Sequence, residues 1–170
     1  MSVVAQTVTQ RLALALPGLA VLLSVLFEIV PLGVRHLADV APLLGLIAVY
    51  YWSIYRPQLI PAPFVFAVGL VHDLLSGGPL GLMALVLVAL HIFCVSQRRV
   101  LIGRSFGVGW FGFMLVAPGA ALLEWIVASI YFMHPMDPVP LLVQLVLTIV
   151  LYPPLNWLFN RVELAVARAA

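Results

Sequence analysis

Three acidic residues stand inside long apolar stretches of the chain and are the first candidates for chemistry. They are Glu28, Asp73 and Glu124. An ionised group in apolar surroundings is costly, so such residues normally face other protein groups or water and often mark a functional site. One interpretation is a polar site for a proton, a cation or a cationic ligand. The other is structural, with each carboxyl hydrogen-bonded to a neighbouring helix.

The histidines and serines add no recognisable catalytic pattern. The histidines fall at positions 36, 72, 91 and 134, without the spacing of a metal-binding helix. His72 is adjacent to Asp73, but neighbours on a helix point about 100° apart and do not form a dyad. His91 is interpreted as a hydrogen-bonded core residue, and Ser76 as part of a surface turn. We therefore expect no catalytic residue, no metal and no cofactor.

The composition indicates that membrane helices hold these residues. Of the 170 residues, 65% are apolar and 8% are charged, and there is no lysine. Turns divide the chain into six apolar segments near the length that crosses a bilayer. We predict an all-α polytopic fold with six transmembrane helices in one integral membrane domain, residues 1–170. The predicted spans are 12–34, 40–55, 59–75, 80–95, 105–132 and 139–162.

The arginines predict the orientation of these spans. If all six cross, seven of the eight arginines lie on one side and Arg35 alone on the other. Positive residues stay on the cytoplasmic side, so both termini are predicted to be cytoplasmic. A re-entrant pair formed by the second and third segments is the alternative, because only the turn arginine between them would change sides. The arginines that set the topology at the inner turns are Arg56, Arg98, Arg99 and Arg104.

Aromatic residues and glycines suggest how the segments pack. The inner end of the second segment carries Tyr50, Tyr51, Trp52 and Tyr55, which we interpret as an aromatic belt at the membrane interface. Gly77 and Gly81 are four residues apart across the turn after the third segment. Small residues allow helices to approach closely in lipid, so this turn is expected to pack tightly, within the chain or against a partner helix.

The turn also carries a recognisable string. Residues 69–81, G-L-V-H-D-L-L-S-G-G-P-L-G, resemble the central motif of the rod shape-determining protein MreD family. The strings Y-W-S-I-Y-R-P at 51–57, S-Q-R-R at 96–99, L-L-E-W at 122–125 and Y-P-P-L at 152–155 fall in that family's order. The resemblance covers nearly the whole chain. Its shared motif falls here on Gly69, Asp73, Ser76, Gly77 and Gly81.

The resemblance implies a multi-pass protein of the bacterial inner membrane and a non-enzymatic scaffold of the cell-elongation complex, supporting side-wall peptidoglycan synthesis. MreC is the expected partner, with RodA, a class B penicillin-binding transpeptidase and MreB in the same complex, membrane lipid around it and no nucleic acid. The family fold is similar to transporter S-component bundles, so a substrate-binding subunit is the alternative function. A third hypothesis, an enzyme acting on lipid-linked precursors, lacks a paired acid and base. Asp73 is expected to accept hydrogen bonds from the backbone or from Ser76.

Overall fold

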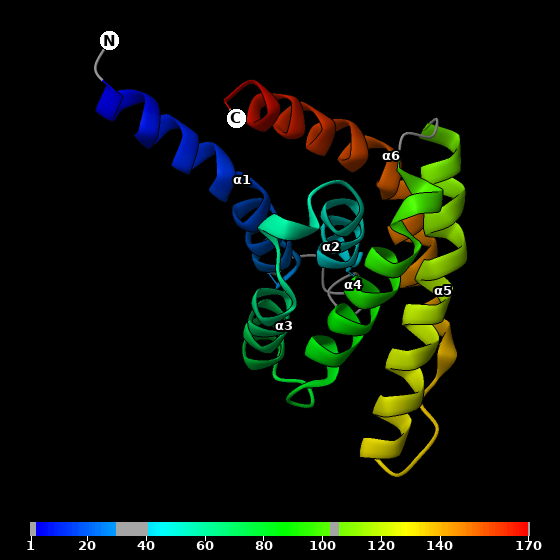
Figure 1. Cartoon of the computed structure of the whole chain (residues 1–170). Coiled ribbons are helices and arrows are strands. Elements are labelled where there is room, and N and C mark those ends of the chain that lie inside the picture. The colour runs from blue at the N-terminus through cyan, green and yellow to red at the C-terminus, as the bar shows by residue number, and fades with distance from the viewer. Residues whose placement is uncertain (1–2, 30–40, 103–105, 170) are drawn as a thin grey trace.

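The computed structural model describes residues 3–29, 41–102 and 106–169. In chain order the elements are α1 (Val3–Ile29), α2 (Leu44–Tyr55), the 3-10 helix η2 (Pro57–Leu59), α3 (Ala62–Ser76), α4 (Leu82–Leu101), α5 (Phe106–Tyr131) and α6 (Pro138–Ala169). Throughout these ranges the only regular structure is helical, which confirms the predicted all-α fold (Figure 1). Several bounds differ from the prediction: α1 begins earlier, α2 begins at Leu44 and not at residue 40, and α4 and α6 continue past residues 95 and 162.

Three helices are long and apolar enough to cross a membrane, among the residues that the structure describes. They are Leu82–Val100, Phe106–Tyr131 and Pro138–Leu164. The shorter apolar helices are Leu14–Ile29, Leu44–Tyr55 and Ala62–Ser76. Helix α2, with 12 residues, is about 18 Å long, whereas the hydrocarbon core is about 30 Å thick. The crossing of all six helices therefore stays a prediction.

Helix α2 forms the centre of the bundle, where it packs against α1, α4 and α6 (Figure 1). Ten of its twelve residues are buried. The interpretation of its aromatic residues as an interfacial belt was wrong, because Tyr50, Tyr51 and Trp52 are at most 1% exposed. The reason is tertiary: α6 covers this end of α2, and its Phe159 ring lies 5.5 Å from that of Tyr51.

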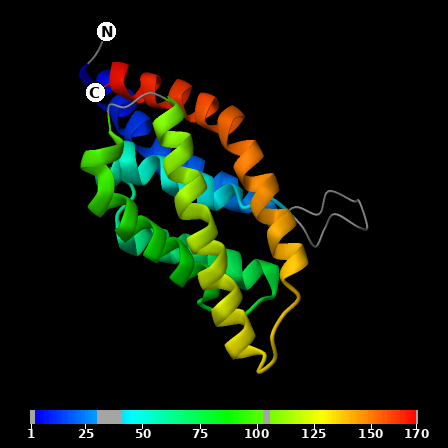
Figure 2. The ribbon, with the colours of Figure 1, turned by 90° about the vertical axis from the view of Figure 1, so that its right-hand side faces the viewer.

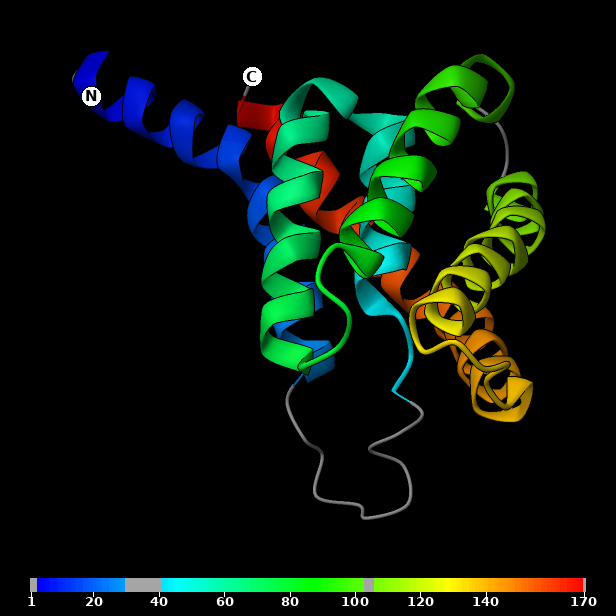
Figure 3. The ribbon, with the colours of Figure 1, turned by 90° about the horizontal axis from the view of Figure 1, so that it is seen from below.

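The two ends of α3 follow ordinary rules of chain geometry. Pro61 caps its N-terminus, where the missing N–H costs nothing. Gly77 ends it with φ 71°, a left-handed conformation that glycine adopts without a steric penalty. Gly81, with φ 90°, then starts α4. Seen from below, α3 and α4 lie side by side and the turn that joins them faces the viewer (Figure 3).

Helix α6 changes direction near a proline pair. Pro153 and Pro154 lie inside it, and each lacks the N–H that would bond the carbonyl four residues earlier. One of these carbonyls, that of Ile149, instead accepts a hydrogen bond from the Trp110 indole of α5 at 3.4 Å. The first part of α6 runs beside α5, and its last turns cross the end of the bundle (Figures 1 and 2).

The arginines of the predicted inner side that the structure places lie at this same end. Arg98 donates from Nε to the carbonyl of Ile54 at 2.7 Å, which gives the C-terminus of α2 a cationic cap. Arg56 Nε lies 3.7 Å from Glu163 Oε1 of α6. Arg99 is exposed. Arg104 lies outside the described residues.

Candidate functional site

A cluster of ionisable side chains lies at the opposite end of the bundle. Glu28 comes from α1, and His72 and Asp73 come from α3. His72 Nε2 lies 3.4 Å from Glu28 Oε1, whereas His72 Nδ1 lies 3.9 Å from Asp73 Oδ1. Glu124 comes from α5, and its Oε2 is buried. The structure therefore brings two of the three carboxylates that the sequence singled out, Glu28 and Asp73, to the same histidine.

Asp73 serves as the N-terminal cap of α4. Its Oδ2 accepts hydrogen bonds from the amides of Gly81 at 2.9 Å and Ala84 at 3.3 Å, and its Oδ1 accepts one from Met83 at 2.9 Å. A helix begins with unpaired amides and a positive end, both of which favour an anion. Gly81 has no side chain to supply this cap, so the carboxylate of the neighbouring helix supplies it.

Ser76 and Gly69 complete the α3–α4 connection in different ways. The Ser76 hydroxyl donates to the carbonyl of Asp73 at 3.4 Å, so Ser76 does not bond the Asp73 carboxylate. Gly69 is the close-packing glycine, because a Cβ on it would lie 2.3 Å from the Cα of Ala84. A Cβ on Gly77 or Gly81 would meet nothing within 4 Å. These two glycines serve the turn's conformation and do not bring helices of this chain together, whereas the docking of a partner helix on them stays a prediction.

Glu28 caps α2 in the same manner. Its Oε2 accepts a hydrogen bond from the Gly45 amide at 3.2 Å. Thr148 of α6 accepts one from the Leu43 amide at 3.0 Å, and Gln144 donates to the carbonyl of Ala41 at 2.8 Å. The start of α2 is therefore bonded by side chains of two other helices. Sequence analysis missed Thr148 and Gln144, since nothing local links them to residues about a hundred positions earlier.

Replacing Thr148 with valine is expected to lower the free energy of unfolding by about 1–2 kcal/mol. Valine has nearly the same shape but cannot accept the hydrogen bond, so the buried amide of Leu43 loses its partner. Unfolding of the detergent-solubilised protein in increasing sodium dodecyl sulfate measures the change. Thr148→Ser, which keeps the hydroxyl, is the control and should lose less than the valine variant. Equal losses would mean that the methyl group, not the hydroxyl, matters.

Two buried polar atoms, one on α3 and one on α5, take no part in capping a helix. Within the described part of the chain, His72 Nδ1 and Glu124 Oε2 are buried without a hydrogen-bond partner. Sequence analysis dismissed a His72–Asp73 dyad, and their 3.9 Å separation is longer than a hydrogen bond. It missed that His72 faces Glu28 on another helix. The described residues hold no group of three or more side chains able to bind a metal ion.

His91 lies apart from this cluster, at the middle of α4. Its Nδ1 is 2.8 Å from the hydroxyl of Ser53 on α2. Because that hydroxyl donates its one proton to the carbonyl of Val49, His91 Nδ1 is the donor of this pair. His91 is 6% exposed, so it is a hydrogen-bonded residue of the core.

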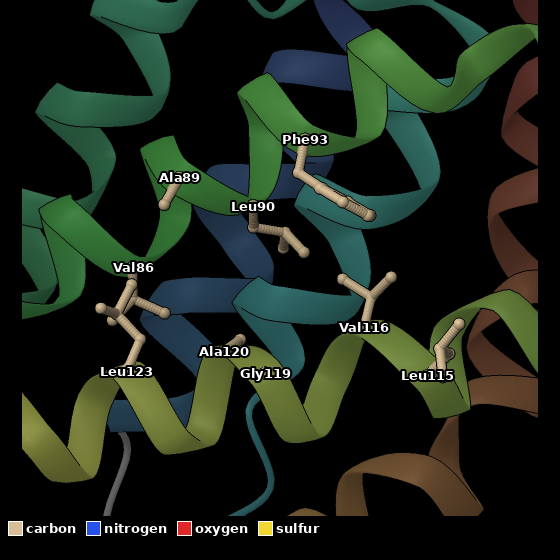
Figure 4. Close-up of a pocket in the computed structure, with 9 residues that line it drawn as sticks. All are labelled: Val86, Ala89, Leu90, Phe93, Leu115, Val116, Gly119, Ala120 and Leu123. Atoms are coloured by element: carbon tan, nitrogen blue, oxygen red, sulfur yellow. The ribbon is translucent and has the colours of Figure 1, made fainter.

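An apolar groove of about 320 Å³ lies between α4 and α5. Small residues widen it: a Cβ on Gly119 would have nothing within 4 Å. Figure 4 shows the side chains of α4 facing those of α5 across it. The lining residues are Val86, Ala89, Leu90, Phe93, Leu115, Val116, Gly119, Ala120 and Leu123.

Comparison with family models places the chain in a known family. The family model described as rod shape-determining protein MreD matches residues 9–162, nearly the whole chain. The chain belongs to the MreD family. Neither the curated proteins nor the solved structures gave a match. The likeness of MreD to transporter S-component bundles therefore stays a prediction for this chain.

Membership of the MreD family indicates the general role of this chain. MreD is a family of rod shape determination and of the membrane, and this MreD chain has helices apolar enough for a bilayer. The residues of the MreD motif that sequence analysis named fall at the α3–α4 connection. Its carboxylate, Asp73, is bonded to three backbone amides of α4.

Proposed function

We propose that this protein is a non-enzymatic scaffold of the cell-elongation complex in the bacterial inner membrane, where it docks MreC and supports side-wall peptidoglycan synthesis. The observation that supports the proposal is that the Asp73 carboxylate of the motif bonds backbone amides of α4. Asp73 is 3% exposed, and both its oxygens are bonded to the start of α4. A carboxylate held in this way fixes a helix pair and is poorly placed to accept a proton from a substrate.

The α4–α5 groove is the surface that we propose for MreC, with its membrane helix as the occupant. The groove lies between two of the three helices long enough to cross a bilayer. Its lining is apolar throughout and includes the small residues Ala89, Gly119 and Ala120. Helices associate in lipid through close packing at such small residues. RodA, the class B transpeptidase and MreB would then join through MreC or through other faces of this chain.

Filling the groove is expected to weaken the complex. Gly119→Leu adds a side chain where a Cβ meets nothing within 4 Å, so the fold should tolerate it while the groove closes. We expect co-purification with MreC in mild detergent to fall at least about tenfold, since loss of one well-packed side-chain contact costs more than about 1.4 kcal/mol. Gly107→Leu is the matched control, because Gly107 is equally open on the same helix but outside the groove.

The outcomes separate this function from its alternatives. Unchanged co-purification of Gly119→Leu would remove the groove as the MreC surface. A small molecule found by native mass spectrometry in the parent protein and absent from Gly119→Leu would favour the transporter-type subunit. Turnover of a lipid-linked wall precursor by the isolated protein would contradict the non-enzymatic assignment.

A further inference from the structure

Helix α6 is longer than a crossing of the membrane requires. Its 32 residues measure about 48 Å, whereas the hydrocarbon core is about 30 Å thick. The proline pair at 153 and 154 divides it, and the part after the prolines turns across the end of the bundle (Figures 1 and 2). This is the end at which Arg98 caps α2 and Arg56 meets Glu163. The last turns of α6 therefore do not continue along the direction of α5.

Residues 155–164 of α6 have an inward face that belongs to the core. Phe159 is 3% exposed, and its ring lies 6.1 Å from that of Trp52. Leu155 and Val162 pack against the same core. The carboxylate of Glu163 pairs with Arg56. These contacts fix which side of the segment faces away from the protein.

The outward face carries a tryptophan, two leucines and an arginine. Trp157 is 60% exposed, and Leu158 and Leu164 are each 48% exposed. The guanidinium carbon of Arg161 lies 4.6 Å from the centre of the Trp157 ring, within the range of a cation–π contact. Arg161 is exposed beside the indole, on a different face of the helix from Glu163, which is paired with Arg56.

This combination fits the boundary between lipid headgroups and acyl chains. Tryptophan concentrates at that boundary, and helices that lie in it place large apolar side chains toward the acyl region and cationic side chains among the headgroups. We propose that residues 155–164 lie parallel to the membrane surface as an interfacial anchor, and that Arg161 binds the phosphate of an anionic phospholipid. The positive charge of Arg99, exposed at the same end, adds to the attraction for anionic lipid.

Depth measurements along the segment test its orientation. In a Cys94→Ala background, Trp157→Cys, Arg161→Cys and Leu164→Cys each carry one spin label, with the protein in nanodiscs of phosphatidylcholine and phosphatidylglycerol. The three labels are expected at the same shallow depth. A helix that crosses the membrane would change depth by roughly 10 Å over these seven residues. Val150→Cys, on an exposed position before the prolines, is the control and should read deeper than all three.

Either other result overturns the anchor. A steady change of depth from 157 to 164 would mean that α6 crosses the membrane to its end. Full access to water at all three positions would mean that this face is free of lipid and available to a soluble protein.

Lipid retention tests the role of the charge. Arg161→Gln is expected to retain about fivefold less phosphatidylglycerol in native mass spectrometry of protein released from nanodiscs, as the loss of one interfacial cation predicts. Arg161→Lys keeps the charge and should retain the parent level, and the retention of phosphatidylcholine should not change in either variant. Equal phosphatidylglycerol retention by Arg161→Gln and the parent would show that Arg161 does not bind the headgroup.

Discussion

The Asp73→Ala variant is expected to lose about 3 kcal/mol of its free energy of unfolding. Three amides at the start of α4, those of Gly81, Met83 and Ala84, lose their acceptor at once. A buried donor without a partner costs about 1–3 kcal/mol, and loss of an N-terminal cap costs about 0.5–2 kcal/mol. The first turn of α4 fraying into the space left by the carboxylate would recover part of this. Unfolding in increasing sodium dodecyl sulfate, followed by circular dichroism, measures the loss.

Two further variants decide whether capping is the cause. Asp73→Asn keeps one oxygen acceptor and the shape of the side chain, so its loss should fall between those of the parent and Asp73→Ala. Asp137→Ala removes another carboxylate that accepts a helix-start amide, that of Val139 at 2.9 Å, but at an exposed position. Water can replace that carboxylate, so this variant should lose at most about 1 kcal/mol. Equal losses for Asp73→Ala and Asp137→Ala would contradict a special role for the buried cap.

A methyl group on Gly69 is expected to destabilise the fold by about 2–3 kcal/mol. Its Cβ would lie 2.3 Å from the Cα and 2.7 Å from the amide nitrogen of Ala84. Both are backbone atoms, which cannot rotate away, so α3 and α4 must move apart. That separation would also stretch the bonds from Asp73 to the start of α4. The same denaturant titration of Gly69→Ala gives the magnitude.

Gly119→Ala provides the matched comparison for this variant. It also lies inside a helix, but its Cβ meets nothing within 4 Å. Alanine favours the helical conformation over glycine, so Gly119→Ala should gain up to about 1 kcal/mol. The two Gly→Ala changes are thus expected to have opposite signs. A Gly69→Ala protein as stable as the parent would mean that α3 and α4 do not need their close approach.

The helical segments could be predicted because their signals are local. Apolar runs between prolines, glycines and arginines mark each helix, and each predicted segment overlaps one α-helix of the described residues. The importance of Asp73 was also accessible, since an acidic residue in an apolar stretch must find a partner. Its partners were less accessible, because they depend on how the chain returns through Gly77 and Gly81.

What sequence analysis missed depends on neighbours that are distant in the chain. His72 was compared with the adjacent Asp73, yet its closer partner is Glu28 on α1. Gly69 has the same residue type as Gly77 and Gly81, and only the position of Ala84 distinguishes it as the glycine of close approach. The aromatic residues of α2 have the composition of an interfacial belt, and only the placement of α6 above them turns them into core.

The capping of α2 from elsewhere has a consequence for how the chain is made. Its first amides and carbonyls are bonded by Glu28, Thr148 and Gln144, and its last turn by Arg98. Two of these side chains, those of Thr148 and Gln144, belong to α6, which is synthesised after α2. Until α6 is synthesised, the nascent chain holds a short apolar helix whose N-terminal backbone is incompletely satisfied. The start of α2 can therefore be fully bonded only after α6 has been synthesised and has packed against it.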